Sequence, residues 1–118
     1  MQRMMLHAKI HRARITETSL GYVGSITIDA NLLEASGIVE NEKVLVANLS
    51  NGERFETYAI GGPAGSGQVC LNGAAARMAE IGDRVIVMAF AQVDGAELSD
   101  VWEPRIVQVD ENNQPLSA

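Results

Sequence analysis

A glycine followed by a serine stands at the start of a predicted strand, and these two residues could react with each other. Gly24 and Ser25 stand in YVGSITID, where a polar turn gives way to β-branched residues. A serine hydroxyl can attack the carbonyl behind it and convert the amide into an ester, and glycine permits the strained backbone that this needs. The dipeptide alone is weak, because a second pair, Gly65-Ser66, stands in a predicted loop.

Two histidines and a lysine lie on the polar side of the first predicted strand. His7, Lys9 and His11 alternate with apolar residues between Leu6 and Ile10. The two histidines would be about 13 Å apart at ~3.3 Å per residue, so they cannot share one metal ion. We therefore read both as ordinary polar residues and predict no metal site.

Three further polar side chains lie on a later predicted strand. Arg54 and Tyr58 fall on one face of a regular strand, with Thr57 on the other. An arginine can bind a carboxylate through two N–H groups, and a phenol keeps its proton at neutral pH. Ion pairing and packing explain such residues in most strands, so spacing alone gives them no function.

The elements that must position these groups are mostly short strands. An Asn51-Gly52 turn predicts a tight hairpin through positive backbone angles. The apolar run RVIVMAFAQV predicts a strand that is buried on both faces. The predicted strands are residues 4–15, 25–29, 43–49, 53–60, 68–71, 84–93 and 105–109, the last at an edge.

Two short helices and two loops complete the prediction. Asp29 can cap a helix that Gly37 ends, and the alanine-rich residues 74–81 predict a second helix. Residues 18–24 read as a turn, and the polar end ENNQPLSA is expected to fray. Many short strands without a βαβ rhythm indicate a compact, mainly β barrel with short helices.

The composition favours one acidic domain. The 118 residues suffice for a single core, which is small enough that oligomerisation would help to stabilise it. A net charge of -6 argues against nucleic-acid binding. Cys70 is the only cysteine, in an apolar stretch, so we expect a buried thiol and no internal disulfide. No run is apolar enough for a membrane span, and we expect a cytoplasmic protein.

Four blocks of the sequence resemble the aspartate 1-decarboxylase family. LHAKIHRARIT, YVGSITID, NGERFETYAI and LNGAAARMAEIGDRVIVMAFA occur in the family's order and at its separations, over residues 3–110 without a gap. The resemblance implies a double-psi β-barrel, assembled as a homotetramer with active sites between neighbouring subunits. It also implies a role in making β-alanine for pantothenate.

The resemblance further implies a self-processing enzyme. The single domain 1–118 would be cleaved between residues 24 and 25, giving chains 1–24 and 25–118. Ser25 would become a pyruvoyl cofactor, in place of pyridoxal phosphate and without a metal. Tyr58 would be the proton donor, and Lys9 and Arg54 would contact the carboxylates of the substrate, L-aspartate.

The remaining implied site residues surround the cleaved bond. The hydroxyl of Thr57 would hold the carbonyl of Gly24 during processing. Thr57 and the backbone of Gly73, Ala74 and Ala75 would line the substrate site.

The sequence departs from the family's pattern at three positions. Gly21 stands where histidine is expected beside the cleavage turn, Ala47 where some members have tryptophan, and Arg77 where histidine is common. None removes a group that the chemistry requires, although Gly21 adds flexibility near the reacting bond.

Two other functions remain open at this point. The first is a barrel that never cleaves its own chain and either binds a small anion or serves as a scaffold. The second is a transcription regulator, which the negative charge disfavours. Whether maturation needs a partner protein is not visible in the sequence.

Overall fold

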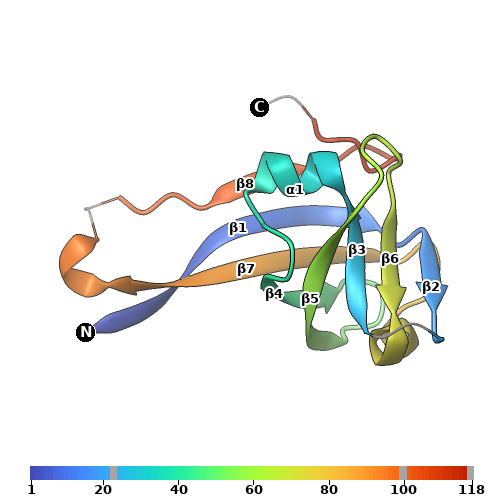
Figure 1. Ribbon diagram of the computed structural model, residues 1–118, viewed down its shortest axis with the longest axis horizontal. Coiled ribbons are helices and arrows are strands. Elements are labelled where there is room, and N and C mark those ends of the chain that lie inside the picture. The colour runs from blue at the N-terminus through green and yellow to red at the C-terminus, as the bar shows by residue number, and fades with distance from the viewer. Residues whose placement is uncertain (22–23, 99–100, 117–118) are drawn as a thin grey trace.

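The computed structural model describes residues 1–21, 24–98 and 101–116 as a mainly β fold, as predicted. Eight strands form one sheet in the order β2-β6-β3-β5-β4-β7-β1-β8 (Figure 1). The strands are β1 Gln2–Arg14, β2 Glu17–Ser19, β3 Ser25–Asp29, β4 Lys43–Asn48, β5 Arg54–Gly62, β6 Val69–Asn72, β7 Arg84–Asp94 and β8 Arg105–Gln108. The helices are α1 Ala30–Ser36 and two 3₁₀ turns, η1 Gly73–Met78 and η2 Gly95–Glu97.

A junction at Thr16 connects the two ends of the sheet. β1 and β6 are near opposite ends of the strand order, yet the Thr16 amide donates to the Val69 carbonyl at 2.9 Å. The Val69 amide in turn donates to Thr16 Oγ1 at 3.0 Å. The sheet therefore curls round on itself and encloses one core, consistent with the predicted barrel; the double-psi crossing stays a prediction.

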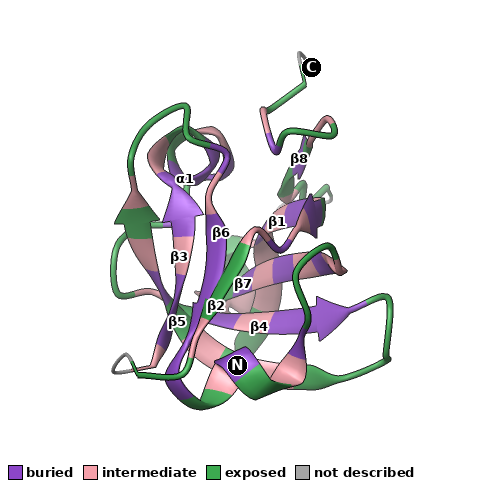
Figure 2. Ribbon diagram, turned by 90° about the vertical axis from the view of Figure 1, so that its right-hand side faces the viewer, coloured by how far each residue is buried: buried purple, intermediate pink, exposed green. Residues whose placement is uncertain are grey.

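Aliphatic side chains from one face of the strands fill this core, and Figure 2 shows the burial concentrated on the strands. Its largest fully buried members are Ile10, Ile15, Ile26, Ile28, Leu32, Ile38, Leu71, Val44, Val46, Val69, Val85 and Val87. The described residues cover the other face of β7 only in part, since Phe90 is 39% exposed and Met88 half-buried. The prediction that β7 is buried on both faces was therefore wrong.

β1 forms the predicted strand but loses its regular alternation at a bulge. Leu6 pairs with Phe90 and Ala8 with the adjacent Ala89, which leaves His7 as the extra residue. Because Phe90 and Ala89 point to opposite faces, Leu6 and Ala8 do too. The prediction of one apolar face from Leu6 to Ile10 was therefore wrong.

The helix predictions were half right. Asp29 Oδ1 accepts from the Asn31 amide at 2.8 Å and Gly37 has φ +79, so α1 is capped as predicted. The predicted helix over residues 74–81 is instead the 3₁₀ turn η1, because the backbone returns to an extended conformation at Ala79. At the hairpin, Gly52 has φ +80, whereas Asn51 has no positive φ.

The polar end of the chain is bound rather than frayed as far as residue 116. Asn113 is fully buried, and its Oδ1 accepts from the Arg14 amide at 2.8 Å. Its Nδ2 donates to the carbonyls of Arg14 at 2.7 Å and Gly67 at 2.9 Å. An amide side chain satisfies backbone groups on two segments at once, so the prediction of fraying was wrong there; residues 117 and 118 lie outside the described residues.

Candidate active site

The hydroxyl of Ser25 is buried and held by one neighbour. Ser25 begins β3, is only 1% exposed, and pairs with Asn72 of β6. Asn72 Nδ2 donates to Ser25 Oγ at 2.8 Å and to Thr27 Oγ1 at 3.0 Å. The reactive oxygen of the predicted chemistry is therefore fixed in place while its own proton remains available for transfer.

Cys70 orients the Asn72 amide. Cys70 Sγ lies 3.3 Å from Asn72 Oδ1. Burial, with a smaller contribution from the Glu17 carboxylate, raises the pKa of the thiol, so at neutral pH it is an S–H donor. Its hydrogen bond to Oδ1 turns Nδ2 towards Ser25. Sequence reasoning predicted a buried thiol, which is confirmed, but missed Asn72, whose signal was its position directly before Gly73.

Gly24 opens onto a hollow of about 240 Å³ that is also lined by three other predicted site residues, Thr57, Ala74 and Ala75. A Cβ at Gly24 would meet nothing within 4 Å, so there is open space beside the bond that was predicted to react. Gly73, with φ +65, starts the turn that carries two of the lining alanines. The hollow is lined by Gly24, Phe55, Glu56, Thr57, Ala74, Ala75 and Met78.

Thr57 lies on the same hollow as Gly24, and the prediction was that its hydroxyl holds the Gly24 carbonyl. Both residues line the wall of the hollow. Among the residues that the structure describes, no hydrogen bond joins Thr57 to the Gly24 carbonyl. The predicted contact therefore needs a rotation or movement of one of the two groups.

Strand register places Tyr58 next to Ser25. β3 and β5 are parallel, with Ile26 level with Ala59, and both of these residues point into the core. The residues before them, Ser25 and Tyr58, therefore lie side by side on the outer face. Tyr58 is 37% exposed, so its phenol borders solvent rather than the core.

The predicted cations lie further along the same outer face. Across the sheet, Lys9 pairs with Met88, Met88 with Leu45, and Leu45 with Glu56. Arg54 is two residues before Glu56 on β5. Ser25 is on the next strand beyond, so about 19 Å of sheet, at ~4.8 Å per strand, separates it from Lys9. Within one chain, Lys9 and Ser25 therefore lie on strands that are not neighbours in the sheet.

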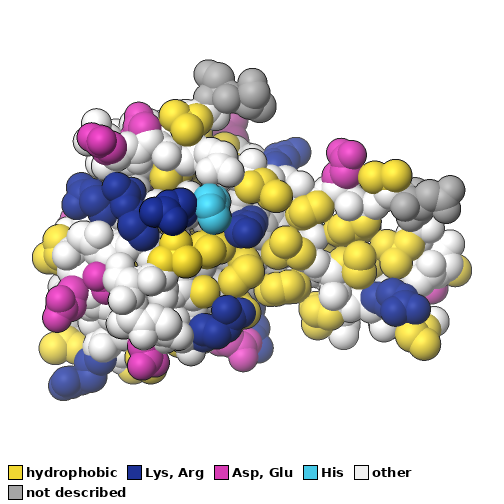
Figure 3. Space-filling view, turned by 180° about the vertical axis from the view of Figure 1, so that it is seen from behind, with side chains coloured by type: hydrophobic (Ala, Val, Ile, Leu, Met, Phe, Trp, Pro, Cys, Tyr) yellow, Lys and Arg dark blue, Asp and Glu magenta, His cyan; other side chains and the backbone are white. Residues whose placement is uncertain are grey.

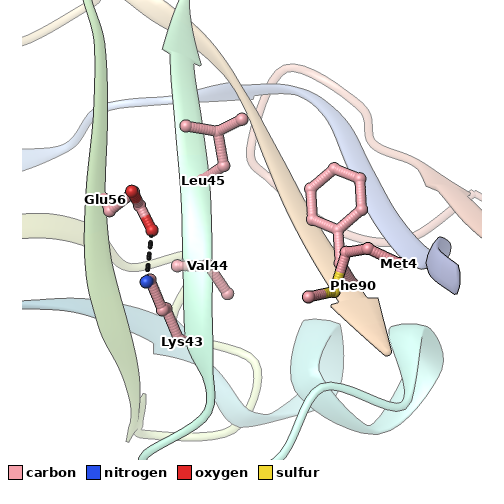
Figure 4. A pocket seen from close by; sticks show the side chains of 6 residues that line it. All are labelled: Met4, Lys43, Val44, Leu45, Glu56 and Phe90. Carbon is pink, nitrogen blue, oxygen red and sulfur yellow. Dashed lines mark ion pairs between the residues drawn. The ribbon is translucent and has the colours of Figure 1, made fainter. Parts of the chain in front are cut away.

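The outer face also carries exposed apolar side chains. The N-terminal end of β1 and the C-terminal end of β7 pair to form a projecting arm (Figure 1). Figure 3 shows hydrophobic groups gathered across the middle of the molecule and along this arm, with lysine and arginine beside them. A second hollow, of about 350 Å³, lies between β4, β5 and the arm (Figure 4). It is lined by Met4, Lys43, Val44, Leu45, Glu56 and Phe90.

Residues 1–21, 24–98 and 101–116 contain neither a metal-binding cluster nor a membrane-spanning helix. No three His, Cys, Asp or Glu side chains in these segments gather closely enough to hold a metal ion. No helix in them has the length and apolar character of a bilayer span. His7 instead bonds through Nε2 to Glu42 Oε2 at 2.6 Å, linking the β1 bulge to the turn before β4.

Comparison with known proteins gives consistent matches along almost the whole chain. The family model described as aspartate decarboxylase matches residues 1–116. The chain is 56% identical to an aspartate 1-decarboxylase of Burkholderia vietnamiensis over 97% of this chain and 89% of that protein. It is 51% identical to an aspartate 1-decarboxylase of Thermoanaerobacter pseudethanolicus over 99% of both chains.

Proposed function

The chain belongs to the aspartate decarboxylase family and is an enzyme that decarboxylates aspartate, and we propose that it acts through a pyruvoyl group made from Ser25. The observation that carries this proposal is a buried serine directly after Gly24, with its Oγ held by Asn72 beside an open hollow. The product is β-alanine for pantothenate synthesis, and the expected compartment is the cytoplasm.

Processing starts at the bond between Gly24 and Ser25. Ser25 Oγ attacks the Gly24 carbonyl, the amide C–N bond breaks, the hydroxyl proton passes to the released nitrogen, and an ester replaces the amide. The Thr57 hydroxyl, on the same hollow, donates to the oxygen of Gly24 as negative charge develops there. A donor of this kind typically contributes ~10² to 10³ in rate.

Elimination then divides the chain. The α-proton of Ser25 is removed, the Cβ–Oγ bond breaks, and residues 1–24 leave with a terminal carboxylate. Uptake of one water and release of one ammonia leave residues 25–118 with a ketone at their start. The reaction balances without an oxidant or a metal.

The residues around Ser25 fit such a group and its substrate. The pyruvoyl group supplies a ketone that takes up the amine of aspartate and a neighbouring carbonyl that accepts electrons as CO₂ leaves. The hollow beside Gly24 has room for the substrate, Ala74 and Ala75 line it, and Gly73 directly precedes them in η1. Tyr58, level with Ser25, donates the proton to the substrate carbon.

We further propose that the complete site forms between subunits of a homotetramer. Lys9 and Ser25 lie on strands that are not neighbours in the sheet, which supports supply of this cation by a neighbouring copy. Lys9 and Arg54 bind the two substrate carboxylates, for which an acidic protein needs local positive charge. The exposed apolar side chains of the outer face support burial against other copies.

Denaturing mass spectrometry of the purified protein after prolonged warming tests the proposal. We expect two fragments split after Gly24, with the larger lighter by one ammonia than a serine-started chain, and release of CO₂ from aspartate. Ser25→Ala should abolish both. Ser66→Ala changes the other Gly-Ser pair, in an exposed loop, and should abolish neither.

An intact, inactive wild-type protein would be tested further with candidate maturation factors. Fragments that appear only with a factor would mean assisted maturation. An intact mass under all conditions would refute the proposal and favour a barrel that binds a small anion or serves as a scaffold.

A further inference from the structure

Glu56 is a negative charge at an unexpected place on the candidate site. It lines the hollow beside Gly24 and also the second hollow next to Leu45 and Phe90. A substrate with two carboxylates would be repelled by an unpaired carboxylate at this position, in a chain whose net charge is already -6. The charge of Glu56 must therefore be compensated.

Glu56 has two cations within reach. Along β5, Arg54 is two residues before it on the same face, about 7 Å away at ~3.4 Å per residue. Across the hairpin, Glu56 pairs with Leu45, so Lys43 is its diagonal neighbour, a position that long side chains reach. Tyr58 is directly opposite Lys43.

The carboxylate pairs with Lys43. Lys43 Nζ lies 2.6 Å from Glu56 Oε2, and Figure 4 shows the two side chains pointing toward one another between β4 and β5. No ion pair between Glu56 and Arg54 occurs in the part of the chain that the structure describes. Glu56 therefore does not occupy the guanidinium of Arg54.

We propose that Lys43 is a positioning residue that holds Glu56 away from Arg54 and so keeps Arg54 available for a substrate carboxylate. This inference rests on the proposed function, in which Arg54 contacts aspartate. Without Lys43, the nearest cation for Glu56 is Arg54, and the internal carboxylate competes with the substrate. Removal of Lys43 therefore weakens substrate binding and leaves the rate of the chemical step unchanged.

Steady-state kinetics of Lys43→Ala test the inference, with the processed fraction measured by mass spectrometry. We expect KM for aspartate to rise ~2- to 5-fold at low ionic strength, since the pair is exposed. The kcat per processed chain should stay within about 1.5-fold, and added salt should reduce the KM difference. Lys43→Arg, which keeps the charge, should retain the wild-type KM.

The double variant Lys43→Ala with Glu56→Gln separates this role from a merely structural one. Removing the competing charge should return KM to the wild-type value. A Lys43→Ala protein with unchanged KM, or a double variant no better than Lys43→Ala, would overturn the inference.

A structural readout separates failure of this inference from failure of the proposed function. A crystal structure of Lys43→Ala should place the Glu56 carboxylate against the Arg54 guanidinium, whether or not the protein turns over aspartate. A Glu56 side chain that stays away from Arg54 refutes the inference. An active, processed wild-type enzyme in the same experiments would leave the proposed function intact.

Discussion

Replacing Asn72 by alanine should slow self-cleavage at one particular step. In the elimination step the electron pair of the Cβ–Oγ bond moves onto Oγ, so negative charge grows on the atom that Asn72 Nδ2 contacts at 2.8 Å. In the earlier attack step Oγ gives up electron density instead. Asn72 therefore assists elimination more than attack, and the ester should accumulate in Asn72→Ala.

The magnitude follows from the loss of one aligned donor. Removing a donor to a developing anion in a buried site typically costs ~10² to 10³ in rate, or about 2.7–4 kcal/mol. Ser25 is 1% exposed, so little water reaches Oγ to replace the lost bond. Elimination should therefore slow by about 100-fold or more.

Hydroxylamine distinguishes the two forms, because it cleaves an ester readily and an amide hardly at all. Warmed Asn72→Ala should show an intact mass that hydroxylamine converts into fragments split after Gly24. Asn112→Ala, which truncates an exposed asparagine, serves as the matched control and should process like the wild type. Wild-type cleavage of Asn72→Ala, with no hydroxylamine-sensitive species, would refute this assignment of Asn72.

Three further predictions concern turnover, packing and pH. Tyr58→Phe keeps the ring and removes the proton, so it should process normally and lose decarboxylation ~10²-fold or more; normal CO₂ release would reassign the donor. Gly67→Ala should lower the free energy of unfolding in urea by about 3 kcal/mol, because its Cβ would lie 2.4 Å from the Asn112 carbonyl oxygen at φ +71. Gly65→Ala, at φ +80 with Asn31 Nδ2 at an ordinary contact distance of 3.9 Å, should cost only about 1 kcal/mol; equal losses would show that the 2.4 Å contact at Gly67 adds no cost. Burial, reinforced by two flanking cations, lowers the pKa of His11 from 6.5, so the unfolded chain binds the proton first as pH falls. Stability should therefore decline below pH 6.5, and His11→Gln should flatten that decline in urea titrations; an unchanged pH profile would remove His11 as its cause.

Elements that depend on near neighbours in the chain were predictable. The β-branched SITID forms β3, and the capping groups of Asp29 and Gly37 bound α1 where the sequence placed it. The hairpin around Gly52 follows from one residue that tolerates a positive φ. Family membership was predictable too, since four blocks in order are far more specific than any single motif.

Elements that depend on partners far along the chain were not predictable. The bulge at His7 exists because β1 must follow β7 while covering one core, and no local pattern announces it. Asn113 is buried because it satisfies Arg14, 99 residues earlier, whereas its composition predicted a frayed tail. The 3₁₀ turn η1 replaces the predicted helix between strands β6 and β7.

The candidate site also combines features that adjacent residues set with features that distant residues set. The sequence by itself determined the Gly24-Ser25 pair that we propose to react, the acidic balance and the residue types available for catalysis, because these are properties of composition and adjacent residues. Only the tertiary structure decided that Asn72 holds Ser25 across 47 residues of chain and that Lys43 pairs with Glu56. Strand register makes those contacts, and register is set by the burial of one shared core rather than by any single segment.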